Sequence, residues 1–193
     1  MTLLNQKTWV VKERVAFPKL TDTYDILDAQ TGAVLGVAKE EPHPILKWLR
    51  LVVKKSLMPT VVNLYEGGTN KVLSIRRGID IFRTKVHVTM GTSDLGYFQA
   101  KMLSIGGSFR MFSPGGEEIG LVKGDWKGWN FVMTSATGQE LGRVTKKWAG
   151  IGKELFTSAD TYVIALSDST RADVAPLLLA AGIAIDTVFK EQG

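Results

Sequence analysis

One repeated pattern dominates the sequence: a β-prone run, a turn that contains Gly with Asp, Asn, Ser or Thr, and a second run that begins Leu-Gly or a near equivalent. Two such runs joined by such a turn are typical of a β-hairpin. The first runs cover 24–28, 61–65, 86–90, 108–112 and 130–133, and the second runs cover 34–37, 72–75, 95–98, 119–123 and 141–146. Their uneven spacing favours repeated hairpins over a strict solenoid.

Five hairpins supply at least ten strands, which is too many for one flat open sheet. A sheet of that size curls and closes, or it splits into two packed sheets. The Gly that follows Leu or Ile at the start of the second runs is typical of a bend where a strand crosses a curved wall. The sequence therefore predicts a mainly β protein, and its 193 residues suit one domain that spans 1–193.

The segment 171–189 breaks the hairpin pattern. Its stretch 174–185 carries no charge and is apolar on all sides, which indicates a helix that is buried or lies in a membrane. A membrane span needs about 20 apolar residues, whereas Asp173 and Asp186 bracket a much shorter stretch, so burial is favoured. We expect Asp173 as the N-cap, Pro176 in the first turn, and the helix along the axis of a closed barrel.

A second exception lies between Pro42 and Pro59. If this segment is a helix, which turns by about 100° per residue, its apolar side chains lie on one face and its basic side chains on the other. It predicts a basic amphipathic helix, with a further strand over 49–53 as the alternative. The basic side chains are Lys47, Arg50, Lys54 and Lys55, and Trp48 can lie at a headgroup boundary beside them.

The chain is basic, with a net charge of +5, so anionic partners such as a membrane surface or nucleic acid are plausible. The segments 123–129 and 146–148 interleave Lys with Trp, as membrane-interface and single-strand nucleic-acid surfaces do. Because Trp also fills barrel walls, Lys146 and Lys147 are the stronger indicators of an anionic partner.

Several function classes lack the residues that they need. The chain has no Cys and two His, which excludes disulfides, thiolate nucleophiles and Cys-type zinc sites and leaves little for a His-based centre. Phosphate-binding loops, the nucleophile elbow and the zinc-protease helix motif are also absent. The pairs Glu40-Glu41 and Glu117-Glu118 would point to opposite faces of a strand. We therefore expect no enzyme activity and no cofactor. The first residues lack a signal-peptide pattern, so we expect a cytoplasmic protein.

The segments 141–150 and 153–162 resemble the penultimate part of the phospholipid scramblase family: a glycine, a basic pair with Trp, a small residue with Gly, then Glu-x-Phe-Thr and an acidic turn. The chain end is similar too, with an apolar helix that leads into Ile185-Asp186, Phe189 and Glu191. Segments 24–28 and 73–77 look like that family's first hairpins. The resemblance implies a Tubby C-terminal-like fold, shared by the plant LURP-one-related proteins: a closed antiparallel barrel of about 12 strands around a central C-terminal helix.

This chain departs from the family in its calcium segment and lacks the Cys cluster used for acylation. Ser158 stands where the first acidic residue would be, Asp160 is retained, Val163 replaces a glycine, and Asp168 is the next candidate oxygen ligand. Ca²⁺ prefers six to eight oxygen ligands with several carboxylates. Asp160 and Asp168 are therefore weak metal candidates, with turn formation as the alternative, and we expect weak Ca²⁺ binding at most.

Together these observations predict a non-enzymatic protein that binds phospholipid or a membrane surface. The alternative is a soluble interaction or scaffold protein, or a carrier of a small apolar ligand, and a nucleic-acid binder ranks third. We expect cytoplasmic localisation with peripheral association at anionic membranes. The candidate lipid-binding residues are Lys47, Trp48, Arg50, Lys54, Lys55, Lys146 and Lys147.

Overall fold

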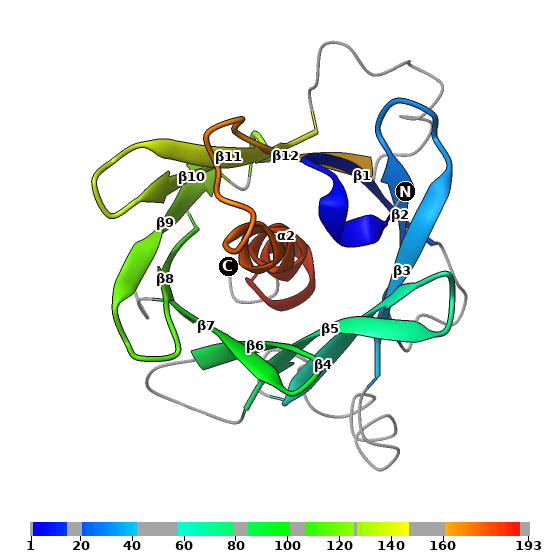
Figure 1. Cartoon of the computed structure of the whole chain (residues 1–193), viewed down its shortest axis with the longest axis horizontal. Helices are drawn as coiled ribbons and strands as arrows, with labels where there is room; N and C mark the ends of the chain where they lie inside the picture. Colours follow the sequence, from blue (N-terminus) through cyan, green and yellow to red (C-terminus); the bar gives the residue numbers. More distant parts are fainter. Residues whose placement is uncertain are drawn as a thin grey trace.

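The computed structural model describes residues 2–14, 21–41, 58–78, 85–100, 107–125, 127–146 and 161–189, in which twelve strands form one closed barrel (Figure 1). The strands are β1 (Thr8–Glu13), β2 (Thr23–Asp28), β3 (Val34–Glu40), β4 (Thr60–Glu66), β5 (Asn70–Arg77), β6 (Lys85–Met90), β7 (Ser93–Ala100), β8 (Ser108–Phe112), β9 (Glu118–Asp125), β10 (Asn130–Ser135), β11 (Glu140–Thr145) and β12 (Thr161–Leu166). Every strand pairs antiparallel with its sequence neighbours, and β1 also pairs with β12, which closes the ring. The closed antiparallel barrel predicted from the sequence is confirmed.

The five predicted hairpins are the pairs β2–β3, β4–β5, β6–β7, β8–β9 and β10–β11. In each, the register shifts by one residue near the start of the second strand, so one residue there is an extra, bulged residue. These residues are Leu35, Val72, Leu95, Ile119 and Leu141, and all five pack against the core. A bulge bends its strand and increases its twist, so its repetition curves the sheet toward closure.

The glycine after the bulge is required by the neighbouring hairpin. A Cβ placed at Gly36, Gly96 or Gly120 would lie 2.0–2.4 Å from a backbone carbonyl oxygen of the next strand. At Gly142 the corresponding distance, to the carbonyl oxygen of Ala165, is 2.7 Å. Because a backbone oxygen cannot rotate away, these positions admit no side chain. The predicted bend is present, and its glycine also lets adjacent hairpins approach closely.

The helix α2 (Ala175–Ala184) lies inside the barrel, near its axis (Figure 1). Every residue from Pro176 to Ala184 is buried, as expected for a helix enclosed on all sides. Gly182 faces Ile164 of β12 so closely that an added Cβ would lie 2.6 Å from the Ile164 Cδ1 atom. A π-helical turn, η4 (Ile185–Phe189), continues the chain. In the described part of the chain, no helix is both long and apolar enough to cross a membrane.

The predicted N-cap is wrong by one residue. Val174 occupies the N-cap position and makes no side-chain cap, and Pro176 lies in the first turn as expected. Asp173 instead pairs with Arg171, with 2.6 Å between Asp173 Oδ2 and Arg171 Nη2, and this hydrogen bond lowers the pKa of Asp173. The missing cap costs little because Pro lacks one of the N–H groups that a cap would satisfy.

The segment 42–57, predicted as a basic amphipathic helix or a strand, lies outside the described residues. A short 3₁₀ turn, η1 (Leu3–Asn5), precedes β1. Its Leu3 is buried, and the carbonyl oxygen of Leu3 accepts a hydrogen bond of 2.9 Å from Trp9 Nε1. The N-terminal turn therefore packs into the barrel core next to β1.

Gly120→Ala should lower the free energy of unfolding by about 1–3 kcal/mol, because the new Cβ would overlap the Thr134 carbonyl oxygen. Gly78→Ala is the matched control, since nothing lies within 4 Å of a Cβ at Gly78 and its φ is not positive. We expect its effect to stay within about 0.5 kcal/mol. Urea unfolding followed by circular dichroism measures both variants, and equal effects would contradict the role assigned to the bulge glycine.

Leu178→Asp should abolish cooperative folding, because Leu178 is fully buried and the carboxylate would have no solvent, a loss of several kcal/mol. Leu178→Met keeps the volume and should cost less than about 1.5 kcal/mol. Soluble yield and thermal melting compare the two. A soluble Leu178→Asp protein with a sharp melting transition would show that α2 lies outside the barrel.

Candidate functional site

The two ends of the barrel differ in character. At one end, the turn end, lie the five hairpin turns and the connection 167–174 between β12 and α2. At the other end, the connection end, the odd-numbered strands finish and the even-numbered strands begin, because all neighbours are antiparallel. α2 starts at the turn end, and the π-helical turn η4 that follows it reaches the connection end, where the Arg77 guanidinium at the end of β5 donates to the Val188 carbonyl oxygen.

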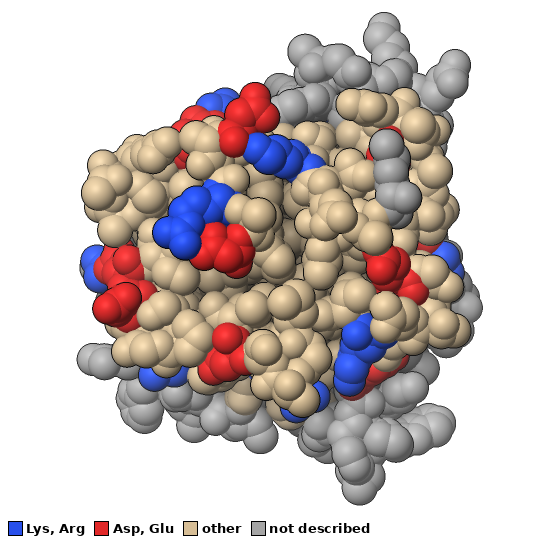
Figure 2. Space-filling model, in the orientation of Figure 1, with Lys and Arg blue, Asp and Glu red and all other residues tan. Residues whose placement is uncertain are grey.

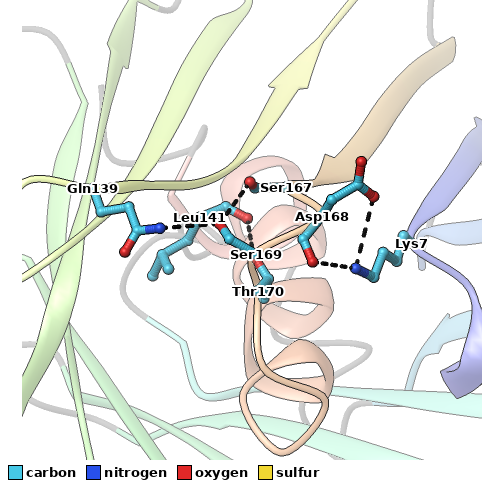
Figure 3. Close-up of polar contacts among 7 residues, drawn as sticks. All are labelled: Lys7, Gln139, Leu141, Ser167, Asp168, Ser169 and Thr170. Carbon is cyan, nitrogen blue, oxygen red and sulfur yellow. Dashed lines mark hydrogen bonds and ion pairs between the residues drawn. The ribbon is translucent and has the colours of Figure 1, made fainter.

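At the turn end, hydrogen bonds fix the connection that leads into α2 (Figure 3). Gln139 Nε2 donates to Ser169 Oγ at 3.0 Å, and the Oγ atoms of Ser167 and Ser169 lie 2.9 Å apart. Thr170 Oγ1 donates to the carbonyl oxygen of Leu141 at 2.6 Å. This network ties the connection to the β10–β11 hairpin and so sets where the helix enters the barrel.

Asp168 belongs to the same turn-end network. Lys7 Nζ lies 3.7 Å from Asp168 Oδ1 and donates to the Asp168 carbonyl oxygen at 2.6 Å (Figure 3). Asp168 follows the end of β12, at the turn end, whereas residue 161 begins that strand at the connection end. Asp160 lies outside the described residues, so the predicted pair stays a prediction. Within the described ranges, no cluster of three or more His, Asp or Glu side chains could hold a metal ion.

The connection end contains a ring of buried polar side chains, which we call the polar floor. Its members come from strand ends and from the end of the central helix, and each is less than a tenth exposed. They are Glu13, Asp22, Glu40, Thr60, Arg77, Asp186 and Thr187. Polar groups in such numbers inside a barrel need partners, since a buried charge is tolerated when it is paired and hydrogen-bonded.

Arg77 links the polar floor to the helix. The side chain is 3% exposed, and its guanidinium donates to the carbonyl oxygens of Val188 at 3.1 Å and Met58 at 2.7 Å. It also donates to Thr60 Oγ1 at 3.0 Å. The last carbonyls of a helix lack partners within the helix and carry partial negative charge, so a buried cation at this position stabilises them.

Two tyrosines stand beside the buried carboxylates of the polar floor. Burial raises the pKa of Tyr24 and of Tyr162 well above the ordinary value, and the nearby Asp186 carboxylate raises both further. Both phenols are therefore neutral at neutral pH. A neutral phenol does not act as a base, so the pair fits a structural role in the floor.

Lys146 also lies at the connection end, above an aromatic cluster. Its Nζ is 4.8 Å from the centroid of the Trp129 ring, a distance typical of a cation–π contact. Trp129 is 9% exposed and packs against Tyr162 with 5.0 Å between ring centroids. The expectation that a Trp of this segment fills the barrel wall is thus met at Trp129, whose φ of 48° is unusual for a bulky residue.

Most predicted lipid-binding residues lie outside the described residues; they are Lys47, Trp48, Arg50, Lys54, Lys55 and Lys147. Sequence reasoning missed Arg77, although a signal was present. Every second side chain of a strand points to the same face of the sheet. Because Leu73 and Ile75 of β5 point into the barrel, the side chain of Arg77 points inward as well.

Charges of both signs are interspersed on the face of the barrel seen along its axis. Figure 2 shows Lys and Arg beside Asp and Glu, with no large area of one sign. Close pairs support this picture: Arg14 Nη2 lies 2.5 Å from Asp25 Oδ1, and Arg143 Nη2 lies 2.9 Å from Glu140 Oε2. Exposed pairs of this kind contribute little stability, but they neutralise the surface on which they lie.

The fold and the site together define a class: an antiparallel barrel that is filled by a helix and has buried polar side chains at one end. A family model of the scramblases matches residues 19–192. The chain therefore belongs to the scramblase family, as its resemblance to phospholipid scramblases predicts. This family is not a classical enzyme family. Comparison with curated proteins gives no match, and comparison with solved structures also gives none.

Arg77→Gln should lower the free energy of unfolding by about 3–5 kcal/mol, since it removes the buried guanidinium and its hydrogen bonds to the Val188 and Met58 carbonyl oxygens and to Thr60 Oγ1. The neighbouring Arg76 is exposed, and Arg76→Gln should change stability by less than about 0.5 kcal/mol. Chemical unfolding of both variants at neutral pH makes the comparison. Similar losses for the two would contradict the role of Arg77 at the helix end.

Proposed function

We propose that this protein binds anionic phospholipid membranes through the connection end of its barrel, without catalysing a reaction. The observation that carries the proposal is the uneven distribution of charge along the chain. Acidic and basic side chains nearly balance among the described residues, whereas the whole chain has a net charge of +5. The basic excess therefore comes from the other segments, above all from 42–57.

The segment 42–57 contains Lys47, Arg50, Lys54 and Lys55 and no acidic residue. The described residues on either side of it lie at the connection end: Glu41 follows β3, and Met58 contacts Arg77 of the polar floor. Lys146 lies at the same end and is followed in the sequence by Lys147. The chain therefore connects most of its candidate lipid-binding residues to one end of the barrel.

Electrostatics sets the strength expected of such an interaction. Each basic residue near an anionic membrane contributes on the order of 1 kcal/mol, and the attraction fades beyond a Debye length of about 8–10 Å. Four or five such residues give weak, reversible binding. Membership of the scramblase family supports phospholipid as the partner, since the family is named for the movement of lipid between leaflets.

Vesicle sedimentation tests the proposal directly. The protein should bind vesicles that contain phosphatidylserine and should not bind pure phosphatidylcholine, and binding should weaken steeply as salt rises. Lys54→Glu with Lys55→Glu should reduce binding by about tenfold or more, because two attractive charges become repulsive.

Lys71→Glu with Arg171→Glu is the matched control, since both side chains are exposed at the turn end and the change in net charge is the same. An equal loss in the two double variants would mean that net charge alone drives binding. Absence of binding to anionic vesicles, or equal binding to neutral ones, would contradict the proposal and favour the soluble scaffold or carrier. Binding to an oligonucleotide without binding to vesicles would favour the nucleic-acid alternative.

A further inference from the structure

A row of aromatic side chains crosses the outer wall of the barrel on strands β6 to β8. His87, Tyr97 and Phe112 are cross-strand partners in register. The ring centroids of His87 and Tyr97 lie 5.7 Å apart, and those of Tyr97 and Phe112 lie 5.0 Å apart in a stacked arrangement. Their sequence neighbours Val86, Phe98 and Met111 are buried, so the row faces away from the core.

Basic side chains border this row. Arg76 of β5 pairs with His87 in register, and Lys85 and Arg110 flank Gln99 in the adjacent row. Lys85 Nζ lies 4.7 Å from the centroid of the Tyr97 ring. We call the six residues Arg76, Lys85, His87, Tyr97, Arg110 and Phe112 the outer patch.

The cations of the outer patch are mostly not neutralised by the protein. Arg110 pairs with Glu118 at 3.2 Å. Neither Arg76 nor Lys85 forms an ion pair with another described residue: Arg76 bonds Ser74, and Lys85 contacts the ring of Tyr97. Both positions are exposed. The patch therefore differs from the walls where Arg14 and Arg143 are paired with carboxylates.

We infer that the outer patch is a second contact surface for anionic phospholipid, so that the barrel docks with strands β5 to β8 turned toward the headgroups. This inference rests on the proposed function and adds the orientation of the protein on the membrane. Unpaired cations complement the anionic headgroups, and a tyrosine among them offers an apolar ring with a polar tip, which suits the boundary between headgroups and acyl chains. Arg76 and Lys85 also lie near the connection end, so both surfaces can meet one membrane.

The ring geometry favours lipid over single-stranded nucleic acid. Nucleic-acid platforms leave aromatic faces open so that bases stack on them. Here the Tyr97 ring stacks on Phe112 of β8, and Lys85 Nζ of β6 lies over the same ring. Both strands that flank β7 therefore contribute a contact to Tyr97. The Tyr97 ring is therefore already in contact with protein groups, which leaves less of it open to a stacking base.

Charge reversal at matched positions tests the inference. Lys85→Glu should weaken binding to phosphatidylserine vesicles by about fivefold, which corresponds to roughly 1 kcal/mol. Lys71→Glu is the control, because Lys71 is also exposed on the outer wall but lies at the start of β5, at the turn end. We expect Lys71→Glu to bind like the parent, and circular dichroism should show that both variants are folded.

The absence of Cys allows a second, independent measurement. A fluorophore that responds to polarity can be attached at Gln99→Cys, between Lys85 and Arg110 of the outer patch, or at Arg143→Cys on β11, away from the patch. On binding anionic vesicles, emission should shift to shorter wavelength at position 99 and stay unchanged at position 143.

The outcomes separate this inference from the proposed function. If the parent binds anionic vesicles but Lys85→Glu and Lys71→Glu bind equally and neither label responds, the outer patch is not a contact surface, and the connection end alone accounts for docking. If the parent does not bind anionic vesicles, both proposals fail. If the parent binds an oligonucleotide or an acidic peptide in the absence of vesicles, and Lys85→Glu abolishes that binding, the assignment of the outer patch to lipid is also wrong.

Discussion

The structure depends on one constraint: the barrel must surround the helix, and the helix must fill the barrel. α2 is apolar on every side, so it is stable in water only if a sheet surrounds it completely. A twelve-stranded barrel, in turn, is wider than its own side chains can fill, because diameter grows with strand number. The central helix fills that space, and Gly182 allows it to lie directly against Ile164 of β12.

This arrangement also explains why the two ends differ. The helix must enter the barrel at one end, and there the Ser167–Thr170 network and Lys7 hold the connection in place. The helix must finish at the other end, where its last carbonyls are buried and need donors. Arg77 supplies one to the Val188 carbonyl oxygen, and buried carboxylates lie at the same end of the barrel. One end is thus closed by turns, and the other collects charged residues and the longer connections of the chain.

The sequence predicted the features that rest on local patterns. The five hairpins, the bend at the Leu-Gly steps and the buried helix follow from periodicity and turn residues, and the structure confirms them. β1 and β12 were not predicted as strands, since they meet each other across the whole chain and no turn joins them. All six residues of β12 are buried, so it lacks the alternation by which a half-buried strand is recognised.

The candidate site was less predictable for the same reason. Arg77, Asp186 and Tyr162 are far apart in sequence and lie at the same end of the barrel only because β5 and η4 finish there and β12 begins there. Asp173 was predicted as the N-cap because it is a good cap residue, but the helix begins beyond it and Arg171 binds its carboxylate. Lys146 could be located, whereas the segment 42–57 and Lys147 lie outside the described residues.

Hydrogen exchange of the α2 backbone amides tests the enclosure of the helix most directly. Buried inside a closed barrel, the amides of residues 179–184 can exchange only when the whole barrel opens. Their exchange should therefore be as slow as the slowest amides of β1 and β12, with the same free energy of opening and the same denaturant dependence. Exchange of the α2 amides at a lower free energy, while the strands stay protected, would show that the helix leaves the barrel independently and would contradict this account.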